Sequence, residues 1–366
     1  MRIGLFSLRT EFHVSGERNS TLALLDTLRA LGAEVTDHTG GEAGATFGLG
    51  NVVGWSHVRR LRGALRAGAL DFYFVKIATI AQLPLVNLLA GGRRSDRLVI
   101  LLDSVCSDRA SLGSFWRELR HEPVYALGKR VANHSEWARF SRLRPRAFIG
   151  SAEAQIDEAR ATLGRHHSYW VIPNTSLAGA APAPRAARPG GATVIGYLGP
   201  PRAYKGCLEV IEAARLLQGH GLFTLKAAFN IPGSPRIRRL WREAGGEEAG
   251  IVNAEEFIRS VDILCVPNYA EYGTKVYPNI LLEAARAGVP LVTSRLPVIV
   301  ELLGEESPLP YLLQVSGRDI AVAIREVLRQ DRTMLADYLQ VRSRQFSAEI
   351  IRERWRAFLA TLANAS

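Results

Sequence analysis

The sequence predicts an α/β protein of two domains of similar size, each with a parallel sheet covered by helices. Segments typical of strands and of helices alternate along the chain, which is the pattern of parallel sheets. The 366 residues exceed the ~100–200 of a typical single domain. Residues 176–191 interrupt the alternation, because they are rich in Ala, Pro and Gly and lack periodicity, which favours a linker.

The first half opens with a short apolar run, which predicts a buried strand. Leucines then recur at helical spacing until Gly32 closes the segment, which predicts an amphipathic helix. A long apolar stretch, residues 72–91, contains Lys76 and Pro84, so we interpret it as a strand and a buried helix rather than a membrane span. The expected strands are Arg2–Ser7, Ala33–Asp37, Phe72–Lys76, Arg97–Leu102 and Ala147–Gly150, and the expected helices include Ser20–Leu31 and Ile156–Leu163.

The alternation restarts after the linker. We therefore expect one domain over residues 1–175, a second over 176–347, and a closing amphipathic helix within 348–366 that packs back toward the first domain. The expected strands of the second half are Thr193–Leu198, Thr224–Phe229, Ile263–Val266 and Pro290–Thr293, and the expected helices are Cys207–Leu217, Arg236–Ala244, Asn279–Ala287 and Ala348–Leu362.

Composition limits the class of protein. Apolar residues make up 47% and charged residues 22%, which excludes collagen-like, disordered and disulfide-scaffold proteins. Three widely spaced cysteines give neither a disulfide framework nor a zinc motif. The first apolar run stops after Phe6 and is followed by charged residues, so we expect no secretory segment. We therefore expect a soluble, cytoplasmic protein.

The net charge is +11; residues 1–175 carry +7 of it and contain three clusters of basic residues. This pattern suggests an anionic partner, although a solvated basic surface explains it equally well. No aromatic-interleaved basic strand or recognition helix is visible, so nucleic acid is not the expected partner. The clusters are Arg59, Arg60, Arg62 and Arg66; Arg93, Arg94 and Arg97; and Lys129, Arg130, Arg139, Arg142, Arg144 and Arg146.

Two strand-to-helix turns contain glycine and could bind an anion. The turn at residues 11–17 includes Gly16 and precedes a helix N-terminus, but it lacks G-x-G-x-x-G, and an ordinary connection explains it as well. The turn at residues 199–206 begins with Gly199 and carries Arg202 and Lys205 just before a helix. Two cations at this position could hold a diphosphate, or they could be exposed loop charges.

The third motif follows the strand that ends at Pro267. A polar loop leads to a helix whose first amides, at Asn279 and Ile280, would favour phosphate. Glu283 lies farther into the helix between apolar neighbours, where two adjacent ribose hydroxyls would suit its carboxylate. A helix-surface glutamate beside Arg286 is the alternative.

In this order the motifs resemble the retaining glycosyltransferases of family 4, which have the GT-B fold: two Rossmann-like domains that face each other across a cleft. The resemblance extends over nearly the whole chain. The sequences that carry it are P-N-x-L-L-E-A-x-x-x-G-x-P from Pro278, V-I-P-N at 171–174, F-I-G-S-A-E at 148–153 and H-V-S-G-E-R at 13–18.

The resemblance implies a nucleotide-diphosphate sugar on the second domain and a hydroxyl acceptor on the first: a glycan, a lipid-linked sugar or a natural product. Lys205 matches the diphosphate-binding lysine and Glu283 the glutamate that contacts ribose. The companion arginine would directly follow Gly199, where this chain has Pro200, so Arg202 is the substitute.

The first glutamate of the family's acidic motif has two candidates. Counting back from the ribose glutamate gives Lys275, whereas counting forward from the preceding strand gives Glu271 with an insertion after it. We favour Glu271, because a lysine cannot accept hydrogen bonds from sugar hydroxyls. Asp103 falls near the position where many members have a catalytic-site histidine.

The implied reaction needs cations and helix amides to stabilise the leaving phosphate. No D-x-D motif or His/Cys cluster is visible, so we expect neither a metal nor a cofactor beyond the donor substrate. In retaining members the leaving phosphate itself takes the acceptor proton, and no protein base is assigned. A nucleotide-sugar epimerase and a degenerate nucleotide-sugar binder remain alternatives. The basic first domain suggests an anionic or lipid-linked acceptor at the inner membrane face.

Overall fold

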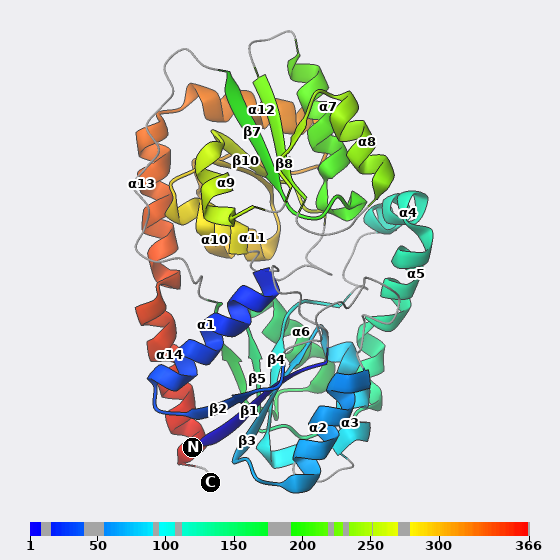
Figure 1. Ribbon diagram of the computed structural model, residues 1–366, viewed down its shortest axis with the longest axis vertical. Coiled ribbons are helices and arrows are strands. Elements are labelled where there is room, and N and C mark those ends of the chain that lie inside the picture. The colour runs from blue at the N-terminus through cyan, green and yellow to red at the C-terminus, as the bar shows by residue number, and fades with distance from the viewer. Residues whose placement is uncertain are drawn as a thin grey trace.

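The structure is a computed structural model that describes residues 1–8, 16–39, 55–90, 95–106, 112–174, 192–218, 223–229, 234–250, 252–269 and 279–364. The chain forms two lobes, and each lobe contains one parallel sheet (Figure 1). The predicted α/β class is therefore confirmed.

The first sheet has the strand order β2-β1-β3-β4-β5-β6. Its inner strands are almost wholly apolar, and β3, FYFVKI, is buried at every position, as expected for a parallel sheet covered on both faces. The strands are β1 (Arg2–Ser7), β2 (Glu34–Asp37), β3 (Phe72–Ile77), β4 (Leu98–Leu102), β5 (Ala147–Gly150) and β6 (Tyr169–Val171).

Helices cover both faces of this sheet (Figure 1). One face packs against α1 and α14, and the other against α2, α3 and α6. The elements between the strands are α1 (Gly16–Ala30), α2 (Trp55–Ala67), η2 (Ile80–Gln82), α3 (Leu83–Ala90), η3 (Ser95–Arg97), α4 (Leu112–His121), α5 (Pro123–Ala132), η5 (Ser135–Phe140) and α6 (Glu153–Leu163).

The second sheet has the strand order β12-β11-β10-β7-β8-β9, and all its strands are parallel. Gly196 lets β7 approach the chain that leads into β10, because a Cβ there would lie 2.6 Å from Val261. The strands are β7 (Thr193–Leu198), β8 (Phe223–Ala228), β9 (Glu247–Glu248), β10 (Ile263–Val266), β11 (Leu291–Ser294) and β12 (Tyr311–Leu312).

Helices of the second lobe pack around this sheet, and α7 and α12 lie side by side (Figure 1). Polar residues begin several of them: the hydroxyl of Ser316 accepts a hydrogen bond from the Asp319 amide at the start of α12. The helices are η6 (Ala203–Lys205), α7 (Cys207–Leu217), α8 (Pro235–Glu243), α9 (Ala254–Ser260), α10 (Asn279–Arg286), α11 (Pro297–Leu303), α12 (Gly317–Arg329) and α13 (Arg332–Ser343).

The chain then returns to the first lobe. After η7 (Arg344–Phe346), helix α14 (Ala348–Ala363) runs down one side of the molecule, so that both termini lie at the far end of the first lobe (Figure 1). The buried side chains of α14 recur at helical spacing and join the core of the first sheet. They are Ile351, Trp355, Phe358, Leu359 and Leu362.

Candidate active site

The strand order of the second sheet determines where a ligand would bind. The chain runs outward from β7 through β8 and β9 on one side, and through β10, β11 and β12 on the other. Between β7 and β10 the connections therefore leave in opposite directions, which opens a crevice outside the carboxyl ends of these strands. The turn with Arg202 and Lys205 follows β7, and the polar loop that leads to Glu283 follows β10.

The turn after β7 is held against the end of β10. Gly206 has φ +70°, and a Cβ there would lie 2.2 Å from the carbonyl oxygen of Pro267, so a side chain is excluded by both conformation and space. The amide of Tyr269 donates to the carbonyl of Tyr204 at 3.1 Å. Lys205 lies between these two contacts, with its Nζ 5.4 Å from the centre of the Tyr204 ring.

Helix α10 begins at the same crevice. Asn279 and Ile280 form its first turn, and Glu283 follows one turn later, half-buried. The Asn279 amide also contacts the first lobe, because its Nδ2 donates to Ser20 Oγ at 3.0 Å. The N-terminal part of α10 therefore meets α1 across the two lobes.

A second contact joins the lobes at the β7 turn. Arg202 forms an ion pair and hydrogen bond with Glu122, which lies at the junction of α4 and α5. Both side chains are largely buried, at 13% and 10% exposure. The arginine expected at the diphosphate is thus bound to the first lobe in this structure.

Three sequence predictions concern residues at or beyond the limits of the described chain. Glu271 and Lys275, the two candidates for the first acidic position, lie outside the described residues. Gly16 was expected in a turn, but it is the first residue of α1.

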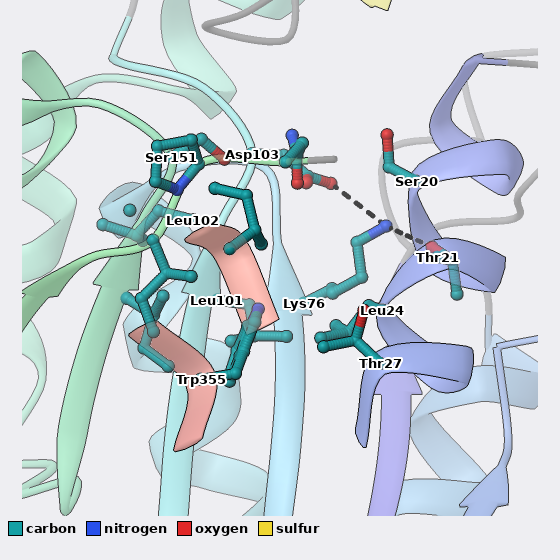
Figure 2. Close-up of a pocket in the computed structure, with 16 residues that line it drawn as sticks. Ser20, Thr21, Leu24, Thr27, Lys76, Leu101, Leu102, Asp103, Ser151 and Trp355 are labelled. Carbon is teal, nitrogen blue, oxygen red and sulfur yellow. Dashed lines mark hydrogen bonds and ion pairs between the residues drawn. The ribbon is translucent and has the colours of Figure 1, made fainter. Parts of the chain in front are cut away.

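The first sheet presents a polar group at its own carboxyl edge. Lys76, at the end of β3, is only 5% exposed, and its Nζ lies 2.7 Å from Thr21 Oγ1 and 3.7 Å from Asp103 Oδ2 (Figure 2). These residues line a pocket of about 40 Å³ between α1, the strand ends and Trp355 of α14. This volume has room for water molecules beside the ion pair.

Hydrogen bonds from α6 stabilise the strand ends around this pocket. Gln155 is fully buried, accepts from the Ser151 amide at 2.6 Å and donates to the Leu102 carbonyl at 2.9 Å. Glu158 accepts from the Cys106 amide at 2.9 Å. The loops after β4 and β5 are therefore tied to one helix, which keeps Asp103 in a defined place.

The start of α1 is positioned by a charged network. Arg18 donates to Asp37 Oδ2 at 3.0 Å and to Thr39 Oγ1 at 2.7 Å. Burial raises the pKa of the Asp37 carboxyl, but hydrogen bonds from Thr39 and Arg18 and the arginine charge outweigh it, so the pKa lies below its ordinary value.

The cysteines near the second crevice are not nucleophiles. Burial raises the pKa of Cys265 to about 12, and burial together with the charges of Glu209 and Glu248 raises the pKa of Cys207, at the start of α7. Both thiols are therefore protonated near neutral pH. Among the described residues, no group of three or more His, Cys, Asp or Glu side chains is arranged to hold a metal ion.

The second lobe matches a known family. Residues 192–330 match the family model described as Glycosyl transferases group 1. Anabaena Alr3699/HepE, solved in complex with UDP-glucose, superimposes with a TM-score of 0.68 at 16% identity, covering 99% of this chain and 100% of that one. The chain has the GT-B fold.

Other GT-B neighbours agree. The α,α-trehalose 6-phosphate synthase from Burkholderia multivorans has a TM-score of 0.65 at 12% identity, covering 100% of this chain and 99% of that one. A chain of the GtfA/B complex has a TM-score of 0.57 at 14% identity, covering 84% of this chain and 61% of that one. No match was found among curated proteins.

The sequence analysis did not identify the residues that support the carboxyl edge of the first sheet or that join this lobe to the β7 turn. Lys76 entered it only as a charge that argued against a membrane span, although a lysine at the end of a buried apolar strand is itself a signal. Thr21 and Glu122 carried no recognisable signal, because only the packing of α1 and α4 brings them to their partners.

Proposed function

We propose that this chain is a retaining glycosyltransferase of family 4 that transfers a sugar from a nucleotide-diphosphate donor to a hydroxyl acceptor. The proposal depends chiefly on one observation: β7 and β10, the strands that precede the turn with Lys205 and helix α10 with Glu283, are neighbours at the switch point of the second sheet. The family match covers this same lobe.

In this proposal the second lobe binds the donor. Lys205 and the α10 amides at Asn279 and Ile280 stabilise the charge that develops on the leaving diphosphate, and Gly199 lets the backbone approach it. Glu283 accepts hydrogen bonds from the ribose hydroxyls. Because Arg202 is paired with Glu122, it reaches the diphosphate only by sharing or leaving that pair, so Lys205 carries more of the stabilisation.

The acceptor binds above the edge of the first sheet, and Asp103 faces the reacting sugar from that side. The leaving phosphate takes the proton of the acceptor hydroxyl on the same face of the sugar, which retains the anomeric configuration. The chemistry then needs neither a dedicated protein base nor a metal ion, and the donor itself is the only small molecule required.

Activity with a panel of UDP-, GDP- and ADP-sugars tests the proposal. UDP-glucose is the first donor to test, because a structural neighbour was solved with it. We expect the nucleoside diphosphate to be released at the same rate with and without EDTA. The anomeric configuration of the product, measured by NMR, should be the same as that of the donor. An inverted product would refute the retaining mechanism. Donor binding without turnover on any acceptor would favour a degenerate binder, and a changed sugar without transfer an epimerase.

Variants at the donor site give a second test. Glu283→Ala should lose most activity while the far-ultraviolet circular dichroism stays unchanged, because the ribose loses its bidentate acceptor. Glu271→Gln should impair transfer more than Lys275→Ala does. The reverse order would assign the first acidic position to Lys275.

The acceptor class follows from the charge of the first domain. Because basic clusters gather there, we propose an anionic or lipid-linked acceptor. Activity on such an acceptor should fall as salt rises, since salt screens exposed charges. Equal activity on a neutral soluble acceptor at low and high salt would contradict this assignment.

A further inference from the structure

Helices α4 and α5 and the turn η5 carry a concentration of exposed apolar side chains. We call it the α4–η5 face, and its members are 45–70% exposed. It lies along the outer edge of the first lobe and reaches up to the second (Figure 1). The face consists of Leu112, Trp116, Val124, Leu127, Val131, Trp137 and Phe140.

These apolar residues are separate from the buried face of the same elements. The inner side of the same elements is occupied by Glu118, Ala126 and Ala138, which are at most 2% exposed. On α5 the exposed residues Val124, Leu127 and Val131 recur at i, i+3 and i+7, which places them on one stripe. The elements are therefore packed on one side and apolar on the other.

The stripe continues from α5 into η5. The indole Nε1 of Trp137 donates to the Val131 carbonyl at 2.7 Å, which joins the two elements. The Trp137 and Phe140 rings lie 5.9 Å apart between centroids. The aromatic pair therefore adjoins the Val131 end of the aliphatic stripe.

Positive charge surrounds this surface. Residues 112–146 contain eight basic and three acidic side chains, a net charge of +5. Glu118 is buried, Glu122 pairs with Arg202, and Glu136 pairs with Arg139. Arg120, Arg142 and Arg144 are exposed, so the charge presented to the solvent is positive.

We propose that the α4–η5 face docks on a lipid bilayer that contains anionic headgroups. Exposed aliphatic residues with tryptophans at their edge and arginines around them match an element that lies in the membrane interface. The arginines would contact the headgroups, and the apolar stripe would enter the upper acyl region. No described helix is long and apolar enough to cross the membrane, so this contact is peripheral.

Other occupants fit the surface less well. A second copy would oppose two faces of the same positive charge, and repulsion would weaken the pair. Nucleic acid would meet the arginines and could stack on the exposed aromatic rings, but the aliphatic stripe of Val124, Leu127 and Val131 would have no apolar partner in it. A bilayer with anionic headgroups satisfies both the charge and the apolar area.

The face also adjoins the cleft between the lobes. Glu122, at the α4–α5 junction, pairs with Arg202 of the β7 turn, and α4 contacts η6. A docked protein would therefore hold the rim of its cleft near the membrane surface. The docking itself goes beyond the proposed sugar transfer and does not depend on it.

Vesicle co-sedimentation of the full chain tests the proposal. We expect binding to vesicles of phosphatidylcholine mixed with phosphatidylglycerol, and much weaker binding to phosphatidylcholine alone. Arg142→Gln/Arg144→Gln should lower partitioning about 25-fold, since each cation at an anionic surface contributes about a factor of five. Val124→Ser/Leu127→Ser/Val131→Ser should lower it at least ~10-fold, because the buried apolar area is lost.

Two matched controls test whether the loss of vesicle binding is specific to this face or follows from removing any exposed arginines or any exposed apolar side chains. Arg236→Gln/Arg239→Gln removes two exposed arginines of the second lobe from α8, whose described residues include no exposed large apolar side chain. Leu216→Ser/Leu313→Ser/Val322→Ser removes three exposed apolar side chains from the second lobe. Both controls should bind vesicles like the unmodified chain.

Three results would overturn the proposal. The first is no sedimentation with anionic vesicles, and the second is an equal loss in the control and test variants. The third is a concentration-dependent dimer that the stripe variant abolishes, since that would assign the face to a second copy. Vesicle binding without sugar transfer would leave this inference intact and count against the proposed function instead.

Discussion

The ion pair between Lys76 and Asp103 gives the sharpest test of the first-domain edge. At a separation of 3.7 Å the two charges attract by about 4.5 kcal/mol at an effective dielectric constant of ~20. The side chains are 5% and 12% exposed, so removing either partner leaves the other in a poorly solvated place. We expect Lys76→Met and Asp103→Asn each to cost about 3 kcal/mol in the free energy of unfolding.

Thermal melting monitored by circular dichroism measures this cost. A loss of about 3 kcal/mol should lower the Tm of a domain of this size by roughly 6–12 °C. In Lys76→Met/Asp103→Asn neither charge is present, so its loss should be about 2 kcal/mol smaller than the sum of the two single losses. Thr21→Val, which removes only the neutral hydrogen-bond partner of Lys76, should cost about 1 kcal/mol.

The same variants separate positioning from chemistry. If Lys76 acts by holding Asp103, turnover in the double variant should be no lower than in Asp103→Asn alone, because Lys76 no longer has a carboxylate to position. Strictly additive losses in Tm, or a double variant far less active than either single one, would refute the reasoning.

Three further predictions concern other parts of the molecule. Lys205→Ala should lower kcat/KM about 10²–10³-fold, as expected for losing one preorganised group at a developing negative charge, whereas Arg215→Ala on the exposed side of α7 should not; equal losses would contradict the assignment. Gly206→Ala should lower the free energy of unfolding by at least ~2 kcal/mol, because its Cβ would lie 2.2 Å from the Pro267 carbonyl oxygen and φ is +70°. An unchanged Tm would show that the turn can rearrange without cost. Burial and a neighbouring arginine lower the pKa of His57 below 6.5. As pH drops through 6.5 this histidine is therefore protonated more readily in the unfolded chain than in the folded one, so the free energy of unfolding falls. His57→Asn should flatten the dependence of Tm on pH, and an unchanged slope would exclude His57 as the source of that dependence.

Much of the fold could be read from local patterns. Strands Arg2–Ser7, Ala147–Gly150, Thr193–Leu198 and Ile263–Val266 have the predicted bounds, because each is a short apolar run bordered by polar or turn residues. The start of α1 was predicted four residues late, since the residues between Gly16 and Ser20 carry no apolar periodicity.

The candidate site was predictable only where one segment contains the whole motif. The Gly199–Gly206 turn and the start of α10 are such segments, and the strand order places both at one switch point. The domain boundaries and the roles of the individual site residues stay predictions, and the proposed linker lies outside the described residues.

The sequence by itself determined the α/β class, most strands of the two parallel sheets and the turn between β7 and α7, because hydrophobic periodicity and glycine conformation act over a few neighbouring residues. Only the tertiary structure decided the pairing of Arg202 with Glu122, the contact of Lys76 with Thr21 and Asp103, and the return of α14 to the first sheet. These contacts join residues far apart in the chain. Their partners are chosen by which helices pack on which sheet face, and no local pattern of charge or hydrophobicity records that choice.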